Sequence, residues 1–281
     1  MVNERGLRTV RLLVALDSSG PNEDSLRAVS KLLDSDGLEV TALYVEDEDL
    51  LRAASLPGLR EISLSGRESS LDPVRLAREM ASQAAEARRA FEALAERLTG
   101  EHLRLEHRFL VARGRMTEEL DRAAAQSDFV LVSRASRAAG LRPRLGRAFA
   151  QLVQQPKHVL FVNEPWASGS SVVVLRGSGA AVDYGARLAR AQGLRLVVVA
   201  AAESTPGGLP EDAELRQLPT FDERAIAELC VKEDARLLVL PEVPDLDWAE
   251  LLLSLVDRLP CSLLKLAGSE VLVSSADRAR R

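Results

Sequence analysis

Aromatic residues, cysteines and long apolar runs are all scarce in this sequence of 281 residues. Only 4% of the residues are aromatic, so we expect a core of leucine, valine and alanine, and few platforms for stacking nucleic-acid bases. The two cysteines, Cys230 and Cys261, show neither metal-ligand spacing nor a disulfide framework, which favours a reduced cytoplasmic protein. No apolar run approaches the roughly 20 residues of a membrane helix. The first residues lack the apolar segment of a secretory signal, so we expect no membrane insertion and no leader.

An excess of one charge is also missing. The chain has 37 basic and 42 acidic residues and a net charge of −5. General binders of nucleic acid or of membrane surfaces normally carry a basic excess, so we expect neither partner. The hydrophobic fraction of 46% is ample for one large domain or two small ones.

The start of the chain predicts a strand–helix–strand unit. Residues 10–16 form a nearly continuous apolar run, which is typical of a strand buried on both faces of a parallel sheet. A helix over 25–36, ended by Gly37, leads to a second strand over 38–45. Residues 46–70 begin with four acidic residues and predict a long polar loop. We favour this exposed loop over a cation site built from the same acids.

A strongly helical pattern follows over 71–99 and ends at Gly100. This amphipathic helix packs on the sheet in the simplest interpretation, and in the alternative it exposes a face to a partner. The remaining elements of the first half are predicted strands over 103–111, 129–133 and 158–163 and predicted helices over 117–126 and 146–154.

The pattern restarts after a linker over 164–170 that is rich in proline, glycine and serine. SDFVLVS followed by LVQQPKHVLFV in the first half matches ARLLVLP followed by LVDRLPCSLLKL in the second, which indicates an internal duplication. The second copy has no counterpart of helix 71–99. Its elements are predicted strands over 171–175, 194–200, 235–241 and from Pro260, and predicted helices over 180–193 (ended by Gly193), 221–235 and 248–259.

These patterns predict an α/β fold with two tandem domains. Residues 1–165 form the first domain, residues 170–268 a shortened second domain, and residues 269–281 a tail. We expect each domain to be an open, mostly parallel, five-stranded sheet with helices on both faces.

The loop after strand 129–133 has a distinctive spacing: Ser133, two residues, Ser136, nine residues, then Gly146 and Arg147. This spacing resembles the phosphate loop of the universal stress protein (UspA) family, whose nucleotide-binding members carry G-x-x-G, nine residues, then G-S or G-T. The resemblance covers nearly the whole chain. It implies two tandem domains of the UspA-like (adenine nucleotide alpha-hydrolase-like) fold.

Two further motifs carry the resemblance: LLVALDSS, which contains Asp17, and LYVEDE, which contains Val45. The resemblance implies that Asp17 contacts the ribose and adenine of ATP and that the main chain of Val45 contacts the base. The residues that would hold the ribose and the phosphates, with Mg²⁺, are Ser133, Arg134, Ser136, Gly146 and Arg147. A doubly wound sheet binds ligands at the carboxyl ends of its strands, and helix N-termini bind phosphates.

The loop departs from the family pattern. Serines replace two of the three glycines, Arg147 replaces a small hydroxyl residue, and Pro143 removes one N–H donor. The loop also carries five arginines with no acid between them: Arg134, Arg137, Arg142, Arg144 and Arg147. Guanidinium groups bind phosphates through paired hydrogen bonds. Two interpretations are open: an arginine loop that binds a nucleotide through its side chains, and a solvated basic loop that binds none.

The second copy lacks these motifs. Arg176 or Gly177 stands where Asp17 stands in the first copy, and the acids Glu242, Asp245 and Asp247 follow strand 235–241. We predict no nucleotide binding there and a structural role, as the pseudo-dimer partner of the first domain.

Catalytic and metal motifs are absent from the sequence. His102, His107 and His158 are scattered, and no Ser/His/Asp or zinc pattern is visible, so we expect structural histidines and no enzyme. Cys230 fits a core position on a helix, and Cys261 fits either a core position or a redox sensor.

The leading hypothesis is a stress-response regulatory or interaction protein that binds ATP or another adenine nucleotide in its first domain only. One alternative is an ATP-binding switch with slow hydrolysis. Another, drawn from the family resemblance, is a cytosolic regulator of a membrane transporter. The expected assembly is a homodimer or an internal pair of the two domains, and the protein partner is unknown.

Overall fold

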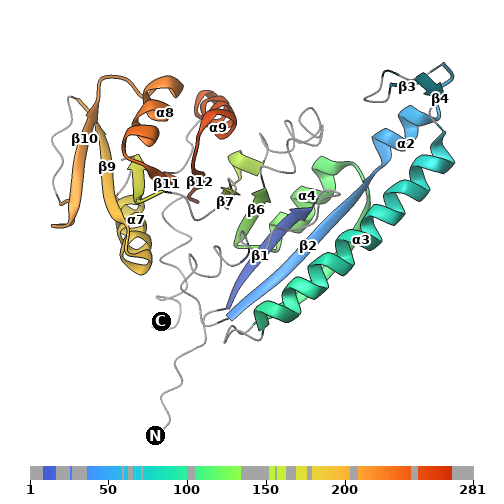
Figure 1. Cartoon of the computed structure of the whole chain (residues 1–281), viewed down its shortest axis with the longest axis horizontal. Coiled ribbons are helices and arrows are strands. Elements are labelled where there is room, and N and C mark those ends of the chain that lie inside the picture. Colours follow the sequence, from blue (N-terminus) through green and yellow to red (C-terminus); the bar gives the residue numbers. More distant parts are fainter. Residues whose placement is uncertain are drawn as a thin grey trace, which may run out of the picture.

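The computed structural model describes residues 9–16, 26, 37–58, 60–62, 66, 68–70, 72–99, 105–133, 152–155, 157–162, 169–175, 179–202, 208–241 and 246–267. These residues form an α/β fold around one sheet of ten strands (Figure 1). Two predicted helices fall largely outside the described residues: 25–36 is described only at Leu26, and 146–154 only from residue 152. The predicted tail also lies outside them.

The two halves of the sheet have the same strand order. The first half runs β5–β2–β1–β6–β7 and the second β10–β9–β8–β11–β12. All neighbouring strands are parallel except β7 and β12, which pair antiparallel and join the halves. The strands are β1 (Thr9–Leu16), β2 (Gly37–Asp47), β5 (Leu105–Gly114), β6 (Phe129–Ser133), β7 (His158–Val162), β8 (Ser171–Leu175), β9 (Arg195–Ala201), β10 (Ala213–Leu218), β11 (Ala235–Leu240) and β12 (Ser262–Lys265).

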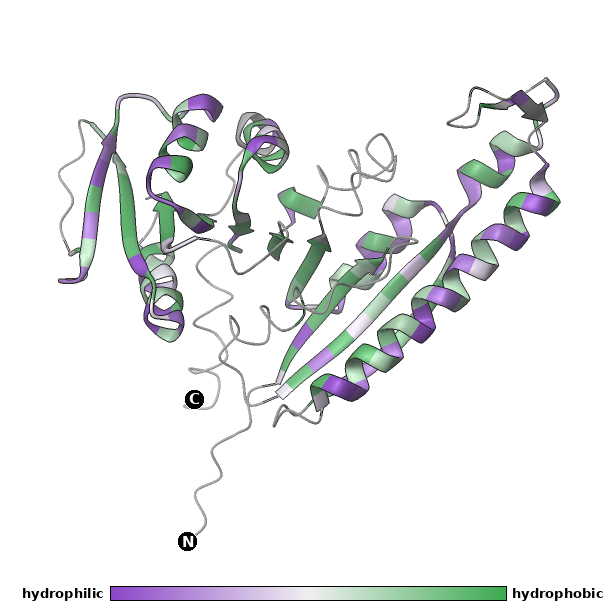
Figure 2. Ribbon diagram, viewed as in Figure 1, coloured by the Kyte–Doolittle hydropathy of each residue, from purple (hydrophilic) through white to green (hydrophobic). Residues whose placement is uncertain are grey.

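Helices cover both faces of the sheet. One face carries α3 (Pro73–Thr99) and α7 (Gly179–Gln192), and the other carries α4 (Met116–Ala125), α8 (Glu223–Lys232) and α9 (Leu246–Arg258). On β1, Leu12 and Val14 belong to the first core layer and Leu13 to the second. Because both faces are covered, the central strands are apolar along their length (Figure 2). The predicted fold class is confirmed.

The two halves meet at the β7–β12 pair. Phe161, Leu160 and Val159 lie opposite Leu263, Leu264 and Lys265. The Lys265 side chain is buried, and its Nζ donates hydrogen bonds to the carbonyl oxygens of Gln155 (2.6 Å) and Lys157 (3.1 Å). His158 is also buried, and its Nδ1 accepts a hydrogen bond from the Ala267 N–H (3.1 Å). The two five-stranded halves are therefore joined into one ten-stranded sheet.

The prediction of a polar loop over 46–70 is wrong. Strand β2 runs on to Asp47, and helix α2 (Glu48–Ala54) begins directly after it. The buried Asp47 side chain caps α2 by accepting a hydrogen bond from the Asp49 N–H (3.0 Å), and two acids stand in the first turn. A small antiparallel sheet of β3 (Arg60–Ile62) and β4 (Glu68–Ser70) follows. The acid run, predicted as loop, is thus a strand end and a capped helix start.

The fifth strand of the second half, β10, was not located by the sequence. Half of its residues, AELRQL, are polar or charged, as is common in an edge strand, and β10 is held by backbone pairing with β9. Arg216 of β10 also pairs with the buried carboxylate of Glu233 (2.6 Å). In the second half only residues 202–212 connect β9 to β10, whereas residues 48–104 connect β2 to β5 in the first. The second half therefore has no counterpart of helix 71–99 between these two strands, as the sequence predicted.

The two predicted glycine caps have different outcomes. Gly193 ends α7 with φ of 63°, and the Leu194 N–H donates back to the Ala189 carbonyl (2.8 Å), so this cap is confirmed. Gly37 is instead the first residue of β2 and pairs with Thr9.

Candidate functional site

The predicted nucleotide site lies at the carboxyl ends of β1, β2 and β6. From β1 the chain first adds β2 and β5 on one side and then adds β6 and β7 on the other. The order of the strands therefore reverses at β1, between β2 and β6. In doubly wound sheets this reversal opens a crevice at the carboxyl ends of the strands. The last residue of β1, Leu16, lies opposite Tyr44 of β2, and Ala15 lies opposite Val132 of β6.

Two of the predicted residues, Val45 and Ser133, lie at these carboxyl ends of the strands. Val45 follows Tyr44, so it lies one residue beyond the pairing of β1 with β2, while it stays paired with Ala112 of β5. Its side chain is buried in the core, so a ligand at this edge would meet the main chain of Val45. Ser133 is the last residue of β6 and pairs with Val162.

The other five predicted site residues lie outside the described residues. They are Asp17, Arg134, Ser136, Gly146 and Arg147. The described strand ends on either side of β1 therefore fit the expected position of the site, and the contacts of its phosphate loop stay a prediction.

The second half repeats the same strand reversal between β8 and β11. The residues expected to replace the nucleotide motifs there, Arg176, Gly177, Glu242 and Asp245, lie outside the described residues, and Asp247 lies in the first turn of α9. The absence of nucleotide binding in this half stays a prediction.

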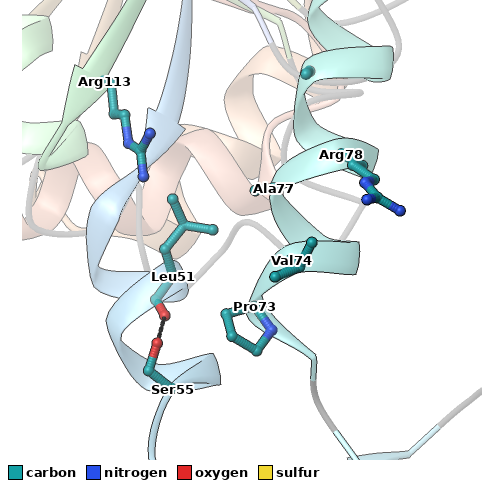
Figure 3. Close-up of a pocket in the computed structure, with 8 residues that line it drawn as sticks. Leu51, Ser55, Pro73, Val74, Ala77, Arg78 and Arg113 are labelled. Carbon is teal, nitrogen blue, oxygen red and sulfur yellow. Dashed lines mark hydrogen bonds between the residues drawn. The ribbon is translucent and has the colours of Figure 1, made fainter.

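A groove that the sequence did not predict lies beside the first half. It has a volume of about 470 Å³ and runs between α2 and α3 near the end of β5 (Figure 3). Its walls are mainly apolar and include Leu51 of α2 and Pro73, Val74 and Ala77 of α3. Arg113 of β5 directs its guanidinium toward Leu51 at the inner end of the groove. The groove depends on α2, which was predicted as loop, so sequence reasoning could not find it.

The acidic run at 46–49 shows no metal site. Asp47 caps α2, Glu48 pairs with Arg52 (2.9 Å), and Asp49 pairs with Arg115 (3.6 Å). Across the described residues, no group of three or more potential ligands could hold a metal ion. None of the described helices is long and apolar enough to cross a membrane.

His158 and both cysteines are buried, whereas His107 of β5 is exposed. The His107 ring packs edge-on against Phe91, with 5.8 Å between the ring centroids. Cys230 and Cys261 are both free and buried. A hydrogen bond with Cys261, together with burial, raises the pKa of the Cys230 thiol well above its ordinary value. A raised pKa disfavours the reactive thiolate, so Cys230 fits the core position expected for it. His102 lies outside the described residues.

Comparison with known proteins rests on structure alone. No protein-family model matches the sequence. No curated protein matches it significantly.

Several solved structures share the fold. A universal stress protein from Archaeoglobus fulgidus DSM 4304 is similar with a TM-score of 0.59 and 13% identity, over 93% of this chain and 97% of that chain. A functionally unknown protein from Pseudomonas aeruginosa PAO1 is similar with a TM-score of 0.55 and 13% identity, over 98% of both chains. The cytoplasmic domain of a prokaryotic cation chloride cotransporter has a TM-score of 0.48 and 11% identity, over 93% of this chain and 96% of that chain. At 13% identity, the similarity to the first two structures, whose TM-scores exceed 0.5, shows the fold alone.

Proposed function

We propose that the protein is a regulatory or interaction protein of the universal stress type, with two tandem domains and a site for an adenine nucleotide in the first domain only. The observation that carries this proposal is the end-to-end structural similarity to the Archaeoglobus universal stress protein. The repeated strand order in the two halves supports the tandem arrangement.

The site of the nucleotide would be the crevice at the end of β1. The main chain of Val45, which lies one residue beyond the β1–β2 pairing, would contact the base, and the phosphate loop would begin at Ser133, the last residue of β6. Asp17 would contact the ribose. The phosphates and Mg²⁺ would then be held by Arg134, Ser136, Gly146 and Arg147, where arginine side chains replace the backbone cradle of a glycine-rich loop.

The second domain would be the internal structural partner of the first. Its sheet continues that of the first half through β7 and β12, so the pair needs no second chain to form. The segment after β11 carries the acids Glu242, Asp245 and Asp247 where phosphates would approach. This charge would repel a nucleotide.

Calorimetric titration of ATP, ADP and AMP with Mg²⁺ tests the nucleotide proposal. We expect one site per chain, with ATP bound more tightly than AMP because the arginines contact the phosphates. The double variant Arg134→Ala, Arg147→Ala should weaken ATP binding by roughly tenfold or more, since charge-assisted hydrogen bonds are lost. AMP binding should change less.

The matched control is the double variant Arg89→Ala, Arg224→Ala, which removes two arginines from exposed helix positions. It should leave the titration unchanged. No heat and no thermal shift with any nucleotide would contradict the nucleotide site, and an unaffected affinity in the loop variant would contradict the role of its arginines.

A further inference from the structure

The two cysteines of the chain lie against one another. Cys230 and Cys261 are the only cysteines among the 281 residues, and residues 231–260 separate them in the sequence. Both are free and buried, and both belong to the same apolar layer of the core. A hydrogen bond joins their thiol groups. Two thiols in contact are the reactants from which a disulfide bond forms.

The arrangement of the second half brings these two side chains together. Helix α8, which carries Cys230, leads into β11 through two residues and packs back against that strand. Ser262, the first residue of β12, pairs with Leu237 near the start of β11. Cys261 comes one residue before this pairing and belongs to the core layer that contains the buried residues of α8. The contact is therefore set by the strand register and by the short connection after α8.

The two thiols differ in exposure and in acidity. Cys230 has no exposed surface, whereas Cys261 is 7% exposed and follows the exposed Pro260. The hydrogen bond with Cys261 and burial raise the pKa of the Cys230 thiol, so Cys230 stays protonated. A small oxidant that approaches from solvent therefore reaches the Cys261 sulfur first.

We propose that Cys230 and Cys261 form a reversible disulfide in the folded protein, with a hydroperoxide as the oxidant. In the first step the Cys261 sulfur attacks a peroxide oxygen and the O–O bond breaks. Cys261 becomes a sulfenic acid, and its thiol proton leaves with the second peroxide oxygen as an alcohol, or as water from hydrogen peroxide.

Cys230 is the resolving thiol in the second step. Its sulfur attacks the Cys261 sulfur, the S–O bond breaks, and the hydroxyl group leaves as water with the Cys230 proton. The two sulfurs together lose two electrons, which the peroxide O–O bond has accepted. A sulfenic acid beside a thiol condenses in this way, whereas one without a neighbouring thiol is oxidised further to a sulfinic acid.

The disulfide closes residues 231–260 into a loop that contains β11 and α9. Cys261 directly precedes β12, the strand that joins the second half to β7 of the first. A closed loop restricts the unfolded chain, so the oxidised protein should be the more stable form. Oxidation thus ties α8 to the junction strand. This modification site goes beyond the proposed function and does not depend on the nucleotide site.

The experiment treats the full, folded chain with hydrogen peroxide. Mass spectrometry after denaturation and alkylation should show the loss of two hydrogens and no alkylated thiol. Digestion should release one peptide pair joined through Cys230 and Cys261, which dithiothreitol separates. The thermal unfolding midpoint of the oxidised chain should rise by roughly 5 °C, and dithiothreitol should reverse the rise.

Two variants test the contact itself. Cys230→Ala removes the resolving thiol, so peroxide should leave Cys261 as a sulfenic acid that dimedone traps, or as a sulfinic acid. The double variant Cys230→Ala, Val231→Cys is the matched control. It keeps two cysteines but moves one thiol to the next position on α8, where the side chain is 65% exposed. We expect no bond between the two cysteines of this chain.

Several outcomes would overturn the proposal. They are two unmodified thiols after peroxide treatment of the folded chain, a sulfinic acid at Cys261 without a disulfide, a disulfide between two chains, and a disulfide that forms only in urea. An equal yield of the intrachain bond in the double variant would contradict the role of the contact. A midpoint that stays the same or falls on oxidation would contradict the stabilising role.

Discussion

Arg11 and Asp128 tie the amino end of β1 to the turn before β6. The Arg11 Nη2 and Nε atoms donate to the two carboxylate oxygens of Asp128 (2.8 and 3.2 Å), and the Arg11 backbone N–H donates to the same side chain (3.0 Å). Burial raises the pKa of Asp128, but the hydrogen bonds from Arg11 outweigh it and hold that pKa below its ordinary value. The fold is therefore coupled to the ionisation of this carboxyl group.

This coupling predicts a pH dependence. Because the folded pKa is below the unfolded value of about 3.9, the pair stabilises the fold above that value and loses its contribution as pH falls through the folded pKa. Asp128→Asn should lower the free energy of unfolding by about 1 kcal/mol at pH 7, since the pair is partly exposed. In urea unfolding, the difference from the unmodified chain should shrink below about pH 4.

Asp212→Asn is the control for this prediction. Asp212 pairs with Arg190 (3.1 Å), and both side chains are more than half exposed, so its removal should change stability little at any of these pH values. A stability difference for Asp128→Asn that stays constant from pH 7 to pH 3 would contradict the account.

At the scale of elements, Phe91 of α3 packs against two rings of strand β5. Phe91 is fully buried, and its ring lies 5.8 Å from that of His107 and 6.1 Å from that of Phe109, both on β5. Phe91→Ala should lower the free energy of unfolding by about 3–5 kcal/mol, because it removes buried area and leaves a cavity. Phe91→Leu, which keeps much of the volume, should cost less in the same urea titration. Equal losses for the two variants would show that packing volume is not the cause.

The strands buried on both faces were predictable from the sequence, and so was the edge strand β5, but the edge strand β10 and helix α2 were not. The strands predicted over 129–133 and 171–175 have the observed bounds of β6 and β8, because strands covered on both faces must be apolar throughout. The sequence did not predict strand β10, because an edge strand with charged side chains has no continuous apolar run. Helix α2 was missed because its acidic start, which caps it, is also typical of an exposed loop.

The candidate nucleotide site stays a prediction. The strand register brings Val45 and Ser133 to the same end of the sheet, and the other five predicted site residues lie outside the described residues. The groove required the contact of α2 with α3, and a tertiary contact between two short surface segments leaves no periodic pattern in the sequence.

At the scale of the whole molecule, the two halves share their core. Each apolar layer contains residues from both halves, and the sheet is continuous through β7 and β12. We therefore expect one cooperative unfolding transition by calorimetry and by urea. Lys265→Ala should lower the transition midpoint, because the buried carbonyls of Gln155 and Lys157 would lose a charged donor.

Arg224→Ala, at an exposed position on α8, is the comparison for Lys265→Ala. This variant removes one positive charge from the second half, away from the β7–β12 junction, so it should lower the transition midpoint by less than Lys265→Ala does. Two separate transitions in the unmodified chain would contradict a shared core.

The most direct test of the proposed function is an experimental structure of the chain grown with ATP and Mg²⁺. The account predicts one nucleotide per chain at the carboxyl ends of β1, β2 and β6, with its base near the main chain of Val45 and its phosphates against the arginine loop. A nucleotide at the ends of β8 and β11, or an empty first site at saturating ATP, would contradict it.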